Sequence, residues 1–175
     1  MAPPLLRLAL FLLTSLVLPR AAAQVREYDV KAAFLLNFTK FIEWPADAFA
    51  DSNSPFAICI IGQDPFGSAL DDVLKGETVA GRNIAIRRIS DIPEPKSCQM
   101  VFTTEAGKEA VAGLRRLGQG VLTVGEGENF VREGGIIGFV IDNRRVRFDI
   151  NRTAAEAAGL KVSSKLFTVA RVVRK

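Results

Sequence analysis

The sequence predicts an α/β fold, a three-layer sandwich in which helices flank a mostly parallel sheet of about five to six strands and the chain ends in a hairpin and two helices. Three observations support this prediction. Short apolar runs alternate with segments of helical periodicity, a long amphipathic segment precedes them, and the 175 residues suffice for one domain of ordinary size.

The first element is a helix over residues 28–44, because Pro45 disfavours helical geometry at Trp44. On a helical wheel one broad face is apolar, and we expect it to lie across a sheet as part of the core. Leu36 is an exception, since it falls among the polar residues. Leu36 and Trp44 therefore have the alternative of contacting a partner. The apolar face comprises Val30, Phe34, Leu35, Phe38, Phe41 and Ile42.

The strands that follow are recognised by apolar runs and by alternation. Residues 56–61 form a continuous apolar run that ends at Gly62, which is typical of a strand buried on both faces of a parallel sheet. Residues 142–144 offer a turn between the last two strands, which predicts a hairpin. The expected strands are residues 56–61, 83–89, 98–103, 121–124, 136–141 and 146–150.

The later helices are recognised by their ends. Asp64 followed by Pro65 favours the start of a short helix, and Gly118 favours the end of the next one. Asn151 caps a further helix that Gly159 closes. The expected helices are residues 65–75, 105–117, 152–158 and a last helix after Ser163 or Ser164 that carries Leu166, Val169, Ala170 and Val173 on one side.

Residues 1–23 have the features of a signal peptide. A short segment with one arginine precedes an apolar run over residues 8–18, and residues 21–23 are the small alanines that cleavage requires. We therefore expect cleavage before Gln24, export to the periplasm, and a single domain over residues 24–175. The apolar run is too short to span a bilayer comfortably, with an uncleaved anchor as the alternative.

Composition excludes several classes of protein. The chain has no histidine, which excludes Ser-His-Asp and Cys-His catalysis and imidazole metal sites. Two cysteines cannot form a structural zinc site alone, and in an exported protein they most simply form one disulfide, between Cys59 and Cys98. This bond would close a loop of roughly 40 residues.

The charge balance gives no reason to expect a nucleic-acid partner. Without the two arginines of the leader the net charge falls from +4 to +2. A basic cluster at Arg144, Arg145 and Arg147 is interpreted as a solvated strand edge.

No motif supports an enzyme. Gly125-Glu126-Gly127 lacks the third glycine of a dinucleotide loop and does not open a helix. Asp71 and Asp72 are adjacent, so they point to different sides of a helix. We expect no catalytic residues, no metal and no cofactor.

A series of blocks in this sequence resembles the YfiR-like family of periplasmic proteins. The first block is long and specific, and the later blocks occur in the order that the family shows. Together they cover nearly all of residues 24–175. The blocks are YDVKAAFLLNFTKFIEWP at residues 28–45, CIIG at 59–62, GGIIGF at 134–139, VRFDIN at 146–151 and AGLKVSSKL at 158–166.

The resemblance implies a regulator rather than an enzyme. YfiR-like proteins are periplasmic, tend to dimerise, and repress an inner-membrane diguanylate cyclase of the YfiN type by binding its periplasmic part, which lowers cyclic di-GMP and biofilm formation. Cys59 and Cys98 lie where such proteins carry a structural disulfide. The best-known member has a second, more labile pair, for which this chain has no cysteines.

The resemblance also implies contact residues for the cyclase. These are Phe139, Glu156, Leu160 and Val162. Each has a structural alternative: Phe139 as strand core, Leu160 and Val162 as packing after a helix stop, and Glu156 as a solvated helix residue.

Two rival hypotheses stay open at this point. One is a periplasmic module that binds a small ligand and acts through another membrane partner. The other is an enzyme of unknown type, which the absence of histidine and of paired carboxylates makes the weakest of the three.

Overall fold

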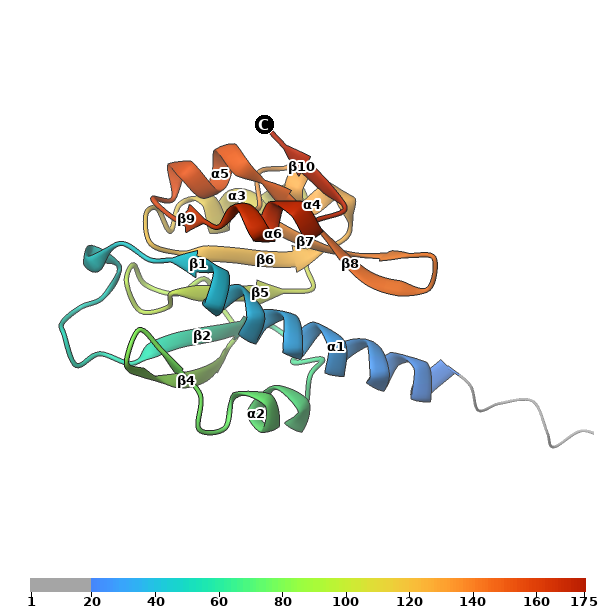
Figure 1. Ribbon diagram of the computed structural model, residues 1–175, viewed down its shortest axis with the longest axis horizontal. Helices are drawn as coiled ribbons and strands as arrows, with labels where there is room; N and C mark the ends of the chain where they lie inside the picture. Colours follow the sequence, from blue (N-terminus) through green and yellow to red (C-terminus); the bar gives the residue numbers. More distant parts are fainter. Residues whose placement is uncertain (1–19) are drawn as a thin grey trace, which may run out of the picture.

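An eight-stranded mixed β-sheet forms the centre of the structure, a computed structural model that describes residues 20–175 (Figure 1). The strand order is β10-β8-β7-β6-β5-β2-β4-β3, and a separate two-stranded ladder joins β1 to β9. The strands are β1 (Ile42–Glu43), β2 (Phe56–Ile61), β3 (Thr78–Val79), β4 (Arg82–Ile89), β5 (Met100–Thr103), β6 (Leu122–Glu126), β7 (Ile137–Asp142), β8 (Arg145–Asn151), β9 (Lys161–Val162) and β10 (Val172–Arg174). The helices are α1 (Arg20–Phe41), η2 (Ala46–Ala48, a 3-10 turn), α2 (Ser68–Leu74), α3 (Lys108–Arg115), α4 (Glu128–Arg132), α5 (Arg152–Ala157) and α6 (Ser164–Val169).

The sheet departs from the predicted one in size and direction. Strands β4, β2, β5, β6 and β7 run parallel to one another. Strand β8 is antiparallel to β7, β10 is parallel to β8, and β3 is antiparallel to β4. The expectation of a mostly parallel sheet of five to six strands is therefore wrong, and the α/β class with its terminal hairpin is confirmed. The missed strands β3 and β10 are two and three residues long, too short to show a pattern.

Helix α1 covers one face of the sheet (Figure 1), and the larger of the two hydrophobic clusters lies between this helix and the strands. The ring of Phe38 is stacked against Phe139 at 5.8 Å and lies edge-on to Phe148 at 5.1 Å. Buried side chains of α2 and α6 complete this cluster. The α1 face is thus an aromatic core built from residues far apart in the sequence.

The predicted apolar face of α1 is rotated relative to the buried one. Leu36 is buried in the core, as are Leu35 and Phe38, whereas Val30 is 44% and Phe41 37% exposed. The buried positions include residues 32, 35, 38 and 42, which is the spacing of a single helical stripe. The expectation that Val30 and Phe41 belong to the core is wrong.

The opposite face holds a smaller cluster, covered by α3 and α4. Its members include Cys59, Val101, Val111, Leu114 and Phe130. Helix α4 begins at Glu128 directly after Gly127, so the expectation that Gly125-Glu126-Gly127 does not open a helix is wrong. The two faces therefore differ in size and in the kind of side chain that fills them.

Several element ends differ from the predicted ones. Helix α1 ends at Phe41, because Ile42 pairs with Val162 across β1 and β9. Helix α2 begins at Ser68, and the carboxylate of Asp64 instead accepts a hydrogen bond from the backbone N–H of Phe66 in a turn. The last helix ends at Val169, since the residues that follow join the sheet as β10.

The predicted caps of the last two helices are confirmed. The side chain of Asn151 accepts a hydrogen bond from the backbone N–H of Ala154 at 2.9 Å, and the side chain of Ser163 accepts one from Lys165. Gly159 has φ +70°, the left-handed conformation that ends α5.

The predicted signal peptide lies mostly outside the described residues, which begin at Arg20 with the first residue of α1. Within the described part of the chain, no helix combines the length and the apolar character that crossing a membrane requires.

Candidate partner-binding surface

The end of α1 and the segment after α5 meet at one corner of the molecule (Figure 1). Strand β1 pairs antiparallel with β9, and the backbone N–H of Ser163 donates to the carbonyl of Phe41 at 2.9 Å. We call the surface made by residues 40–45 and 156–165 the α1–β9 corner. Of the six predicted contact residues, Trp44, Glu156, Leu160 and Val162 belong to these two segments.

Trp44 is fixed in this corner and stays partly exposed. Its indole N–H donates to the carbonyl of Gln99 at 2.9 Å. Its ring lies edge-on to Phe56 with 4.7 Å between centroids. A tryptophan with a satisfied N–H and a held ring can present apolar surface without losing further side-chain freedom.

Three of the predicted contact residues are buried in this structure. Leu36, Phe139 and Leu160 belong to the core under α1, in agreement with the structural alternatives for Phe139 and Leu160. Their part in binding stays a prediction. Glu156 is exposed on α5 and Val162 is half-buried in β9, so both are accessible.

A hollow of about 510 Å³ opens at the corner. Phe41, which is 37% exposed, and Val162 supply its apolar part. Its other lining residues are Lys40, Glu43, Lys161, Ser163 and Lys165. Lys40 forms an ion pair with Glu77 at 3.7 Å, and the remaining Lys161 and Lys165 against Glu43 leave the rim weakly basic. The chemistry of this corner suits a surface that offers an apolar side chain next to carboxylates.

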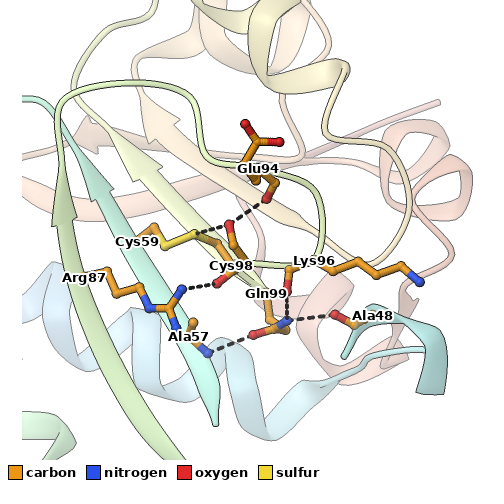
Figure 2. The surroundings of a disulfide bond; sticks show 9 residues. Ala48, Ala57, Cys59, Arg87, Glu94, Lys96, Cys98 and Gln99 are labelled. Carbon is orange, nitrogen blue, oxygen red and sulfur yellow. Dashed lines mark hydrogen bonds between the residues drawn. A yellow bond between two sulfur atoms is a disulfide. The ribbon is translucent and has the colours of Figure 1, made fainter. Parts of the chain in front are cut away.

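The predicted disulfide is confirmed, and Figure 2 shows its surroundings. Cys59 lies in β2 and Cys98 just before β5, with 5.9 Å between their Cα atoms. Both are buried. The hydroxyl of Ser97 donates to the carbonyl of Glu94 at 2.6 Å, and Arg87 donates to the carbonyl of Ser97 at 3.0 Å. These bonds hold the loop that leads into Cys98.

The side chain of Gln99, next to Cys98, makes further hydrogen bonds (Figure 2). Its side-chain oxygen accepts from the backbone N–H of Ala57 at 2.8 Å, and its amide donates to the carbonyls of Ala48 and Lys96. Because the carbonyl of Gln99 also receives the Trp44 indole N–H, the disulfide loop and the corner share one hydrogen-bonded framework.

Two buried charge clusters were missed at the sequence level. Lys31 is only 2% exposed, and its ammonium donates to Glu27 at 2.5 Å and to Glu126 at 2.7 Å. Burial, with Glu126 nearby, raises the pKa of Tyr28 above its usual range. Lys31 precedes Leu35 by one helical turn, and this spacing is the signal that could have identified it as a buried lysine.

The second cluster joins Asp149 of β8 and Glu128 of α4 to Arg171, which lies just before β10. The guanidinium of Arg171 donates to both carboxylate oxygens of the buried Asp149, at 2.8 and 2.6 Å, and reaches Glu128 at 2.8 Å. Hydrogen bonding to Asp149 raises the pKa of Arg171 further above its usual range. A buried carboxylate with a bidentate arginine is stabilised as a pair. Among residues 20–175, no group of His, Cys, Asp and Glu is arranged to hold a metal ion.

Comparisons with known proteins agree with this architecture. A family model described as YfiR/HmsC-like matches residues 28–171. A comparison with curated proteins found no match. The crystal structure of a conserved domain protein from Vibrio cholerae O1 biovar El Tor is similar, with a TM-score of 0.52 and 11% identity, over 84% of this chain and 60% of that chain. At this identity the likeness concerns the fold alone, and this chain spans about 60% of the length of that protein.

Proposed function

Because the chain belongs to the YfiR/HmsC-like family, we propose that it is a periplasmic regulator that binds and restrains a membrane-bound diguanylate cyclase. The observation that carries the proposal is the family match over residues 28–171, nearly the whole of the described chain. The family is periplasmic and regulatory rather than catalytic. A homodimer, which the family resemblance implies, is part of the proposal.

We assign the cyclase contact to the α1–β9 corner. The support is chemical, since an exposed Phe41 and a half-buried Val162 lie within a basic rim, and the held Trp44 follows in the same segment of the chain. Aromatic side chains that lose little freedom on binding are frequent anchors of protein interfaces. The basic rim predicts acidic residues on the periplasmic part of the cyclase.

Repression by binding requires a difference in affinity. The regulator must bind the inactive conformation of the cyclase more tightly than the active one, because a ligand with equal affinity for both shifts neither. A tenfold difference in affinity corresponds to about 1.4 kcal/mol, which a single buried aromatic contact can supply.

The test is the level of cyclic di-GMP in cells that lack this protein, with and without the cyclase. We expect a rise in the single deletion that disappears when the cyclase is also removed. Unchanged cyclic di-GMP, together with no complex between the purified protein and the periplasmic part of the cyclase, would contradict the proposal.

A pair of variants tests the surface. Phe41→Glu places a charge at the proposed contact, and we expect at least a tenfold loss of affinity for the cyclase domain. Val30→Glu is the matched control, because Val30 lies on the same helix and is similarly exposed at 44%. If both variants bind the cyclase domain equally well, the contact lies outside the α1–β9 corner.

A further inference from the structure

The β7–β8 hairpin projects from the body of the molecule (Figure 1). Strand β10 pairs with β8 only from Asp149 to Asn151, so the outer half of the hairpin has no further strand beside it among the described residues. Its turn residues, Asn143 and Arg144, are exposed. The hairpin thus ends in a free tip.

The tip has an unusual backbone for its sequence. Asn143 has φ +48° and Arg144 φ +61°. Two-residue hairpin turns with both central residues at positive φ strongly favour glycine at the second position. Arginine is disfavoured there because its Cβ crowds the backbone. The chain therefore retains a cationic side chain at a position where glycine would fold more easily, and such strain is typical of functional positions.

The side chains around the tip combine positive charge with apolar surface. Ile141 is 55% and Val169 is 56% exposed, two of the large apolar residues that the structure leaves outside the core. Arg147 lies beside Val169, since its guanidinium donates to the carbonyl of Val169 at 3.5 Å. Ile141 lies two residues before the turn, on the other face of the hairpin from Arg145 and Arg147. We call Ile141, Arg144, Arg145, Arg147 and Val169 the hairpin surface.

Ion pairs among the described residues do not neutralise the charges of the hairpin surface. Arg88, Arg132 and Arg171 form ion pairs, whereas the described residues give Arg144, Arg145 and Arg147 none. One carboxylate faces them, because Asp142 lies opposite Arg145 in the ladder. The hairpin surface therefore carries a net positive charge of about two.

We propose that the hairpin surface binds the anionic headgroups of a phospholipid bilayer and holds the protein against the membrane. Arginines interact with lipid phosphates, and each basic residue near an anionic surface strengthens binding about fivefold, equivalent to about 1 kcal/mol. Ile141 and Val169 suit the boundary between headgroups and acyl chains. A flat bilayer fits a projecting, convex tip better than a small molecule does, since small ligands occupy concave sites.

The direct test is binding of the purified protein, released from its leader, to vesicles. We expect sedimentation with vesicles that contain phosphatidylglycerol, little with phosphatidylcholine alone, and a loss of binding as salt is raised. No difference between the two vesicle compositions at low salt would overturn the proposal.

Variants at residue 144 separate function from folding. Arg144→Gly removes one charge and relieves the positive φ, so we expect vesicle binding to fall about fivefold while Tm rises by about 2 to 4 °C. Arg144→Lys keeps the charge and the strain, so binding and Tm stay near those of the parent protein. A purely structural role for Arg144 predicts unchanged vesicle binding in the glycine variant, and that result would contradict the proposal.

Two further controls fix the location and the type of ligand. Arg116→Ala removes an equal charge from an exposed position at the end of α3, and we expect no change in vesicle binding. Soluble heparin serves as a polyanion without a bilayer. If heparin binds as tightly as the vesicles and with the same dependence on Arg144, the surface recognises soluble polyanions and the membrane proposal is wrong.

Discussion

The two faces of the sheet are stabilised in different ways. Under α1, the rings of Phe38, Phe139 and Phe148 pack together with aliphatic side chains of α2 and α6. Among the described residues, no disulfide links members of this cluster. The opposite face has a smaller apolar cluster, and there Cys59 and Cys98 join two neighbouring strands. Where the core is thin, a cross-link takes over part of the stabilisation that apolar burial supplies elsewhere.

The largest effect should come from the aromatic face. Phe38→Ala removes a fully buried ring that touches at least three others, so we expect the free energy of unfolding to fall by about 5 kcal/mol. Urea titration followed by circular dichroism measures this loss. A decrease below about 2 kcal/mol would mean that neighbouring side chains fill the cavity, and that close packing of the rings is not what stabilises this face.

The disulfide should matter almost as much. In the variant C59A/C98A, we expect the free energy of unfolding to fall by about 4 kcal/mol, because the 39-residue separation no longer restricts the unfolded chain. The native spectrum should be unchanged and the urea m value larger, since the unfolded chain exposes more surface. An altered native spectrum with little loss of stability would show that the disulfide does not stabilise the face with the smaller apolar cluster in this way.

A smaller effect is expected where Phe130 fits between two glycines. A Cβ at Gly135 would lie 2.2 Å from the Phe130 ring, and one at Gly125 equally close. Gly135→Ala should therefore lower the free energy of unfolding by about 2 kcal/mol through overpacking. Gly107→Ala is the control, because nothing lies within 4 Å of its Cβ position, and we expect a change below about 0.5 kcal/mol. Comparable losses in the two variants would rule out steric conflict as the cause.

Local patterns predicted the elements whose stabilising contacts are local. The cap at Asn151, the stop at Gly159 and the turn of the β7–β8 hairpin were identified from neighbouring residues. The buried run of β2 was equally clear, because all six of its residues are apolar and buried.

Elements that depend on distant partners were missed or misplaced. Helix α1 ends at Phe41 because β1 pairs with β9, more than a hundred residues later, and no local signal marks that pairing. Helix α4 forms where Gly125 and Gly135 make room for the ring of Phe130, and no local pattern marked these two glycines as packing positions. Lys31 of α1 was not recognised as buried, because its partner Glu126 lies in β6, 95 residues later in the sequence.

The candidate surface shows the same division. Trp44 was a candidate contact because of its place at the end of the predicted helix, and Val162 because of the family resemblance. Only the β1–β9 ladder brings them into one corner. Phe41, which the helical wheel assigned to the core, is exposed there because the true buried stripe is centred closer to Leu35.

The pairing of the α1 face with the end of the chain also has a consequence for the order of events during synthesis. Phe38 precedes Phe148 by 110 residues. At ribosomal rates of about 5 to 20 residues per second, the aromatic stripe of α1 waits roughly 5 to 20 s before the strand that covers it exists. Throughout that interval the stripe is a hydrophobic segment without its native cover, so we expect the chain to be most prone to aggregation before β8 is made.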